Sequence, residues 1–157
     1  ESFFRKINVH IIQCDEKIRD LGDASCIRLL GECYVQGKGV RTNEKKAYEY
    51  FSKAYGLGEP GSYYWMGLAY RYGGAGYDAN IPKAMEIWRE GQSNSRCLNE
   101  LGKCYFWGDG VPKDKDMAYQ YFRKVSDQGK DFADDYLSPD KLSLRSEAEV
   151  ETLINYR

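Results

Sequence analysis

Residues 30–40 read LGECYVQGKGV, and residues 101–111 repeat them closely as LGKCYFWGDGV. A looser copy, MGLAYRYGGAG, lies between them at 66–76. The first glycines of the three copies are 36 and 35 residues apart, and each is followed three residues later by a tyrosine. Self-similarity at a fixed period of about 20 to 50 residues is typical of repeat architectures. The chain is therefore predicted to contain an array of three repeats.

A second motif follows each copy of the first, as KKAYEYFSKA at 45–54, PKAMEIWREG at 82–91 and DMAYQYFRKV at 116–125. These copies share an alanine with an aromatic residue four positions later and an Asn or Asp four positions earlier. Asn and Asp cap the free backbone N–H groups at helix starts. Each repeat is thus predicted to be a helix A, a glycine turn and a helix B. Helices A are expected near 24–36, 61–72 and 96–107, and helices B near 44–56, 81–91 and 115–127.

A glycine in each helix A is expected to face the shared alanine of helix B. Glycine inside a helix costs up to about 1 kcal/mol of helix propensity, which close approach of the two helices can offset. The helix A tyrosines and the helix B aromatics would fill the space beside this contact. The facing pairs are Gly31 with Ala47, Gly67 with Ala84, and Gly102 with Ala118.

This arrangement resembles the Sel-1-like repeat, a tetratricopeptide-like helical module with the approximate signature A…LGxxYxxGxGVxxDxxKAxxWxxKAAxxG. The resemblance covers about residues 24–130 and implies an all-α, right-handed α/α superhelical solenoid of three repeats. The middle copy departs from the signature, because its loop YGGAGYDANIP is one residue longer and lacks the valine found at Val40 and Val111. The repeats are expected at 24–59, 60–94 and 95–130, within a segment 24–137 that includes an exit.

Repeat arrays need terminal elements that cover the apolar faces of the outer repeats. Residues 1–23 are predicted to supply an N-terminal capping helix. Residues 138–157 are predicted to supply a C-terminal one, with Ser146 and Glu149 as a capping box.

The five cysteines are predicted to be free, small core residues. Cys26 and Cys33 are seven residues apart, as are Cys97 and Cys104. That spacing is about 10.5 Å along a helix, too long for a disulfide within it. Cys14 makes the count odd, which favours a reducing, cytoplasmic setting. A bridge from Cys14, and a periplasmic or secreted location after N-terminal processing, remain alternatives.

No catalytic, cofactor or metal site is predicted. The single histidine, His10, has no CxxC motif to complete a zinc site, and the glycine loops lack phosphate-binding spacing. Cysteine-rich members of the resembled family are linked to binding or hydrolysing penicillin-type lactams. Their paired cysteines are missing here, where Tyr55 stands at the helix B position, and the SPDK at 138–141 is interpreted as a helix start. A lactam-binding or lactam-hydrolysing enzyme is the rival class.

The bulk composition excludes two further classes. A net charge of −1 gives no broad basic surface for a nucleic-acid backbone. No apolar run approaches the roughly 18 residues of a membrane-spanning helix. The oligomeric state is not indicated.

A binding surface is the remaining candidate, on the face of helix A that lines the concave side of tetratricopeptide-like arrays. Aromatic residues interleaved with arginines are typical of binding hot spots. Helical spacing predicts the residues of this face in order. They are Arg28, Glu32 and Gln36, then Tyr64, Leu68, Arg71 and Tyr72, then Arg96, Asn99, Lys103, Phe106 and Trp107.

The large residues Tyr72, Phe106 and Trp107 either face a partner or pack on a neighbouring repeat. The expected function is non-catalytic capture of a partner protein. The resemblance implies an adaptor in signalling or protein quality control, or a bacterial immunity protein that neutralises a secreted toxic effector such as a lipase.

Overall fold

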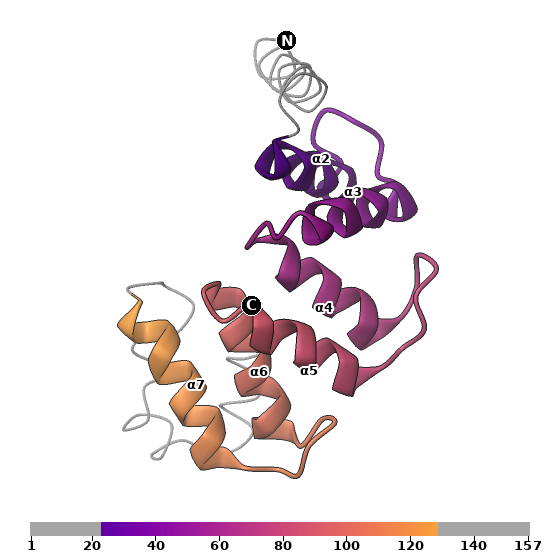
Figure 1. Ribbon diagram of the computed structural model, residues 1–157. Helices are drawn as coiled ribbons and strands as arrows, with labels where there is room; N and C mark the ends of the chain where they lie inside the picture. Colours follow the sequence, from indigo (N-terminus) through magenta and orange to yellow (C-terminus); the bar gives the residue numbers. More distant parts are fainter. Residues whose placement is uncertain (1–22, 129–157) are drawn as a thin grey trace. The chain divides into compact units, whose positions relative to one another are not determined.

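The computed structural model describes residues 23–128, which form six α-helices and no β-strand (Figure 1). Every expected helix is confirmed, with bounds that shift by one residue at most. The predicted capping helices, with Cys14, His10 and the SPDK motif, lie outside the described residues. The helices are α2 (Ala24–Gln36), α3 (Glu44–Gly56), α4 (Ser62–Tyr72), α5 (Ile81–Glu90), α6 (Ser95–Trp107) and α7 (Lys115–Asp127).

The polar residues predicted at helix starts act as N-caps. Asn43 Oδ1 accepts the backbone N–H of Lys46 at 3.0 Å, and Asp114 Oδ1 accepts that of Met117 at 2.9 Å. Each side chain satisfies a backbone donor that has no partner within the helix. The two helices B therefore begin where the repeated Asn and Asp place them.

The glycine turns have the backbone conformation predicted for them. Gly37 ends α2 with φ 67°, and Gly108 ends α6 with φ 74°, both in the left-handed region. Other residues adopt this region only with strain, so the glycines set the end of each helix A.

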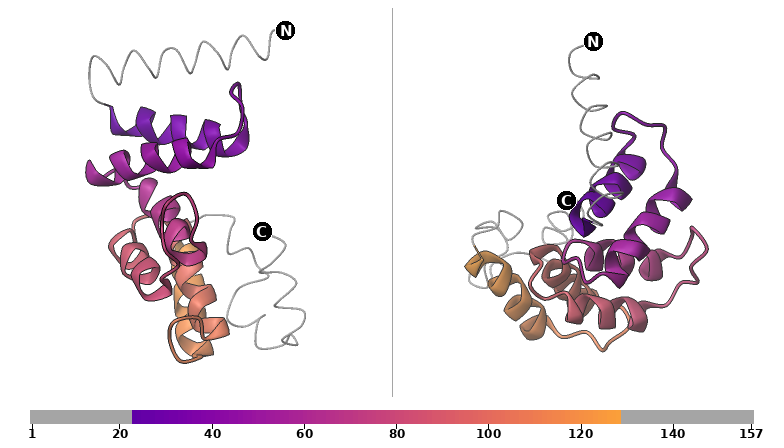
Figure 2. Two further views of the ribbon diagram at one scale, coloured as in Figure 1. Left: turned by 90° about the vertical axis from the view of Figure 1, so that its right-hand side faces the viewer. Right: turned by 45° about the horizontal axis from the view of Figure 1, so that its top comes forward.

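The chain divides into two compact units, one ending at Asn80 and the other beginning at Ile81. In the first unit α2 packs against α3, and α3 against α4; Figure 2 shows α2 and α3 lying alongside each other. In the second unit α5 packs against α6, and α6 against α7. The boundary therefore falls inside the second repeat, between its helix A and its helix B.

The helix A glycines allow the close approach that the sequence predicts. A Cβ built on Gly31 would lie 2.5 Å from Cε1 of Phe51 and 3.1 Å from the carbonyl oxygen of Ala47. A Cβ on Gly102 would likewise lie 2.5 Å from Cε1 of Phe122. Only glycine fits at these positions without displacing a buried ring. The approach of Gly67 to Ala84 stays a prediction, because these residues belong to different units.

Three of the predicted small core positions are confirmed among the cysteines. Cys26, Cys97 and Cys104 are buried, whereas Cys33 is only half-buried, and all four are free. Ser62 and Ala69 are buried at the equivalent places in the second repeat. The core therefore selects these residues for small size.

Candidate partner-binding surface

The first predicted surface residues, Arg28 and Glu32, are engaged within the protein. Arg28 Nη1 donates to Glu32 Oε1 at 2.6 Å, and Arg28 Nε donates to Glu59 Oε1 at 3.0 Å. Burial lowers the pKa of the Arg28 guanidinium, but the charge of Glu32 and the hydrogen bond to Glu59 raise it above its usual value. These groups stabilise one another and are not free for a partner.

This polar cluster joins α2 to the start of α4. Glu59 is 8% exposed, and its Oε2 accepts the backbone N–H of Ser62 at 2.9 Å. Trp65 Nε1 donates to Glu32 Oε1 at 3.2 Å, while the Trp65 ring stacks on Phe51 with centroids 4.8 Å apart. The cluster is therefore a structural connection between the first repeat and the second.

Glu59 and Trp65 were not among the residues predicted from the sequence, although Glu59 carried a signal. It stands eight residues before Gly67, the place where Asp23 and Asn94 precede the other two helix A glycines. Asp23 and Asn94 both cap their helices with side-chain oxygens. An acid at the capping position was thus visible in the repeat alignment.

The end of α4 presents the most exposed aromatic residue of the predicted face. Tyr72 is 72% exposed, and the Arg71 guanidinium lies 5.5 Å from the centroid of its ring. Tyr64 and Leu68 are half-buried, and the Tyr64 ring meets Trp65 edge-on at 5.2 Å. Within the first unit, Gln36 at the end of α2 is also exposed.

In the third repeat the predicted residues divide between the surface and internal contacts. Arg96 is exposed, and Trp107 is half-buried against the core of α6 and α7. Lys103 Nζ donates to Glu100 Oε1 at 2.9 Å. Asn99 Oδ1 is buried and accepts no hydrogen bond from the described residues.

The prediction that Phe106 lines the binding face is wrong. Phe106 is 1% exposed and belongs to a core cluster with Leu98, Ala118, Phe122 and Val125. Phe106 follows Gly102 by four residues, a spacing that puts both on the same side of α6. Its ring therefore points into the core on the same side of α6 as Gly102. Of the adjacent residues Phe106 and Trp107, only Trp107 reaches the surface.

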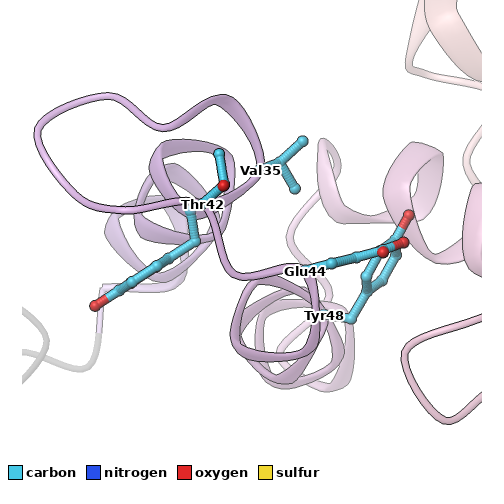
Figure 3. A pocket seen from close by; sticks show the side chains of 5 residues that line it. Val35, Thr42, Glu44 and Tyr48 are labelled. Atoms are coloured by element: carbon cyan, nitrogen blue, oxygen red, sulfur yellow. The ribbon is translucent and has the colours of Figure 1, made fainter.

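A pocket that the sequence analysis did not predict lies where α2 ends and α3 begins (Figure 3). Its volume is about 340 Å³, and it is lined by Tyr34, Val35, Thr42, Glu44 and Tyr48. In Figure 3 the side chains of Glu44 and Tyr48 extend together from α3. Burial, and then the nearby Glu44 charge, raise the pKa of Tyr48 to about 12, so this phenol stays neutral.

Other kinds of site are not seen in residues 23–128. No three His, Cys, Asp or Glu side chains in this range gather as metal ligands would. None of its helices is both long and apolar enough to cross a membrane.

Paired helices, left-handed glycine turns and repeated glycine–aromatic contacts define an all-α helical repeat protein of the solenoid class. The chain matches the Sel1 repeat over residues 24–59, 60–90 and 95–130. It belongs to the Sel1 repeat family.

Solved structures agree with this assignment. A Sel1 repeat protein from Oxalobacter formigenes has a TM-score of 0.68 at 25% identity, covering 78% of this chain and 50% of that one. The protective antigen c5321 of uropathogenic Escherichia coli, which displays an SLR fold, has a TM-score of 0.66 at 26% identity, covering 77% of this chain and 26% of its own. The chain thus spans half or less of the length of these two proteins.

Helicobacter pylori cysteine rich protein B shares the fold alone, with a TM-score of 0.55 at 20% identity over 83% of this chain and 91% of that one. Proteins of the Sel1 repeat family are generally non-catalytic scaffolds for interactions with other proteins.

Proposed function

We propose that this protein captures a partner protein through exposed residues at the ends of its helices A, centred on Tyr72. The observation that carries the proposal is the 72% exposure of Tyr72 beside Arg71. Leu57 is the other exposed large hydrophobic residue of the described chain. An exposed tyrosine in contact with an arginine is the side-chain pair that binding hot spots favour.

The internal contacts narrow the surface that the sequence predicted. Arg28, Glu32 and Lys103 are held in ion pairs, so they serve the fold. On the first unit Gln36 and Tyr72 are exposed and Arg71 is half-buried; on the second, Arg96 is exposed and Trp107 is half-buried. The three residues of the first unit, Gln36, Arg71 and Tyr72, are the proposed contacts.

An immunity protein and an adaptor would use such a surface on different partners. An immunity protein would hold a secreted toxic effector such as a lipase and block it. An adaptor would hold a component of a signalling or quality-control assembly. The identity of the captured protein distinguishes these two roles.

The test is affinity capture from a lysate of the source organism, followed by mass spectrometry. The double substitution Arg71→Ala with Tyr72→Ala should remove the captured partner, because it deletes the exposed ring and its charge. Helical content and thermal unfolding should stay unchanged, since Tyr72 contributes little buried area.

Leu57→Ala is the matched control, because it truncates the other exposed hydrophobic residue at the end of α3. This variant should capture the partner as well as the unmodified chain. If the double variant also retained full capture, the proposed surface would be wrong. A captured effector whose activity the purified chain inhibits would assign the immunity role.

A further inference from the structure

The pocket at the turn of the first repeat combines a carboxylate with aromatic rings. Glu44 and Tyr48 line it from α3, and Tyr34 and Val35 from α2. Tyr77 adds a second ring near Tyr48, with centroids 6.1 Å apart. Glu44 is exposed, and no cationic side chain in residues 23–128 pairs with it.

The third repeat carries a different pair of residues at the equivalent positions, and one of them is a cation. Phe106 occupies the position of Val35, and Lys115 occupies that of Glu44. Lys115 Nζ lies 5.7 Å from the centroid of the Phe106 ring. An ammonium group over an aromatic face is attracted by the ring quadrupole. The third repeat thus places an aromatic ring and a cation where the first has a small side chain and an anion.

We propose that the pocket of the first repeat binds a lysine or arginine side chain of a protein ligand. Glu44 supplies the opposite charge, and Tyr48 with the neighbouring Tyr77 supplies aromatic rings beside it. The Tyr34 ring already has Lys46 Nζ 4.7 Å from its centroid and stacks on Tyr50, so Tyr34 lines the pocket without offering a ring face to the ligand. The volume of about 340 Å³ lies near the small end of ligand pockets, which suits one side chain.

The choice of a protein ligand rests on the proposed function and on the position of the pocket. Val35 lines the pocket and Gln36, the next residue, is exposed at the end of α2. Tyr72 ends α4 at the place equivalent to Gln36. A partner that contacts the ends of these helices would carry its basic side chain directly past the pocket.

The first measurement is an NMR titration of the full chain with the capped tripeptide acetyl-Gly-Lys-Gly-amide. The amide signals of Val35, Thr42 and Tyr48 should shift in a saturable way. The same tripeptide with norleucine in place of lysine should leave them unmoved, because it lacks the ammonium group. Equal shifts with both peptides, or no shifts with either, would overturn the proposal.

Butylamine separates a protein side chain from a free amine. We expect it to shift the same signals with a weaker dissociation constant than the lysine tripeptide. If it bound as tightly as the tripeptide, the pocket would be a general amine site and the assignment to a protein ligand would be wrong.

Two substitutions locate the binding energy within the pocket. Glu44→Gln should weaken tripeptide binding by up to about fivefold, the upper end of the range expected for an exposed ion pair. Val35→Phe should reduce it further, because a larger side chain leaves less room among the lining residues. Glu49→Gln is the control, because Glu49 is an exposed acid of α3 that does not line the pocket.

Glu44 also lies in the first turn of α3, where a negative charge stabilises the helix. A Glu44→Gln variant that lost stability yet bound the tripeptide unchanged would show that this is its only role. These titrations need no partner, so their failure is distinguishable from a failure of capture through Tyr72.

Discussion

The first and third repeats align without a gap from 30–59 onto 101–130, and they share one internal frame. In each, a helix A glycine faces a fully buried phenylalanine, Phe51 or Phe122. In each, the helix A tyrosine stacks on a helix B tyrosine, with centroids 5.8 Å apart for Tyr34–Tyr50 and 5.6 Å for Tyr105–Tyr121. The same residue types at the same spacing thus give the same packing twice.

The two repeats differ at the positions around this frame. Arg28 and Glu32 of the first repeat correspond to Asn99 and Lys103 of the third. Arg28, which also pairs with Glu32, joins α2 to Glu59. In the third repeat Lys103 pairs with Glu100 of its own helix, and Asn99 Oδ1 has no donor among the described residues. The shared glycine, phenylalanine and tyrosine contacts, which form this internal frame, therefore hold the two helices of each repeat together. The side chains around them differ between the repeats and make different contacts.

The largest expected effect tests whether the frame is shared. Phe51→Ala and Phe122→Ala should each lower the free energy of unfolding by about 3–5 kcal/mol, because each removes a fully buried ring beside a glycine. Urea denaturation of the full chain, followed by circular dichroism, measures both. A large loss in one variant and almost none in the other would contradict a common frame.

A smaller effect should separate the two repeats. Arg28→Ala should cost about 1–3 kcal/mol, because it leaves the buried carboxylate of Glu59 without its charged donor. Asn99→Ala, at the equivalent position, should change stability by less than about 0.5 kcal/mol or increase it, because it removes a buried oxygen that has no donor among residues 23–128. Denaturation midpoints of the two variants give the comparison. Equal losses would mean that Asn99 has a role equivalent to that of Arg28.

The smallest structural difference can be measured by thiol labelling. Cys33 and Cys104 occupy equivalent positions, but Cys33 is half-buried and Cys104 is fully buried. Iodoacetamide should therefore modify Cys33 at least about tenfold faster, because Cys104 reacts only when the structure opens. Peptide mapping by mass spectrometry follows each site. Equal rates in the native state would contradict the difference in burial.

The pH dependence of this labelling has a definite sign. Burial and the charge of Glu32 raise the pKa of the Cys33 thiol, an effect that Lys38 partly offsets. At pH 8 the thiolate fraction should therefore be below that of an unperturbed cysteine, and the rate should keep rising above pH 9. Burial and Glu100 raise the pKa of Cys97 to about 12, so it should stay unreactive over the same range.

Most of the described fold was predictable because it depends on local spacing. The Asn and Asp caps, the turn glycines and the glycine–aromatic contact each recur at a fixed offset, so one pattern predicted the helices of all three repeats. Phe106 was misplaced by following the face of Trp107, although its spacing from Gly102 already indicated the core.

The candidate site was predictable only in part, because exposure depends on contacts between residues distant in the sequence. Arg28 lies 31 residues from Glu59, and Glu32 lies 33 residues from Trp65. Helical periodicity places Arg28 and Glu32 on one face, but it does not reveal that Glu59 and Trp65 bind them there. The pocket likewise brings together Tyr34 and Val35 of α2 with Glu44 and Tyr48 of α3, a grouping that arises only once the helices are packed.

The contacts of Phe51 and Glu59 with the second repeat have an evolutionary consequence. Helical arrays lengthen when a stretch of gene is duplicated, and a copy cut at residue 59 would carry Phe51 without Trp65, which stacks on it. It would also keep Glu59 while leaving behind Ser62, whose N–H that carboxylate accepts. A duplication that ended at residue 59 would therefore separate residues that contact each other across the boundary between two repeats.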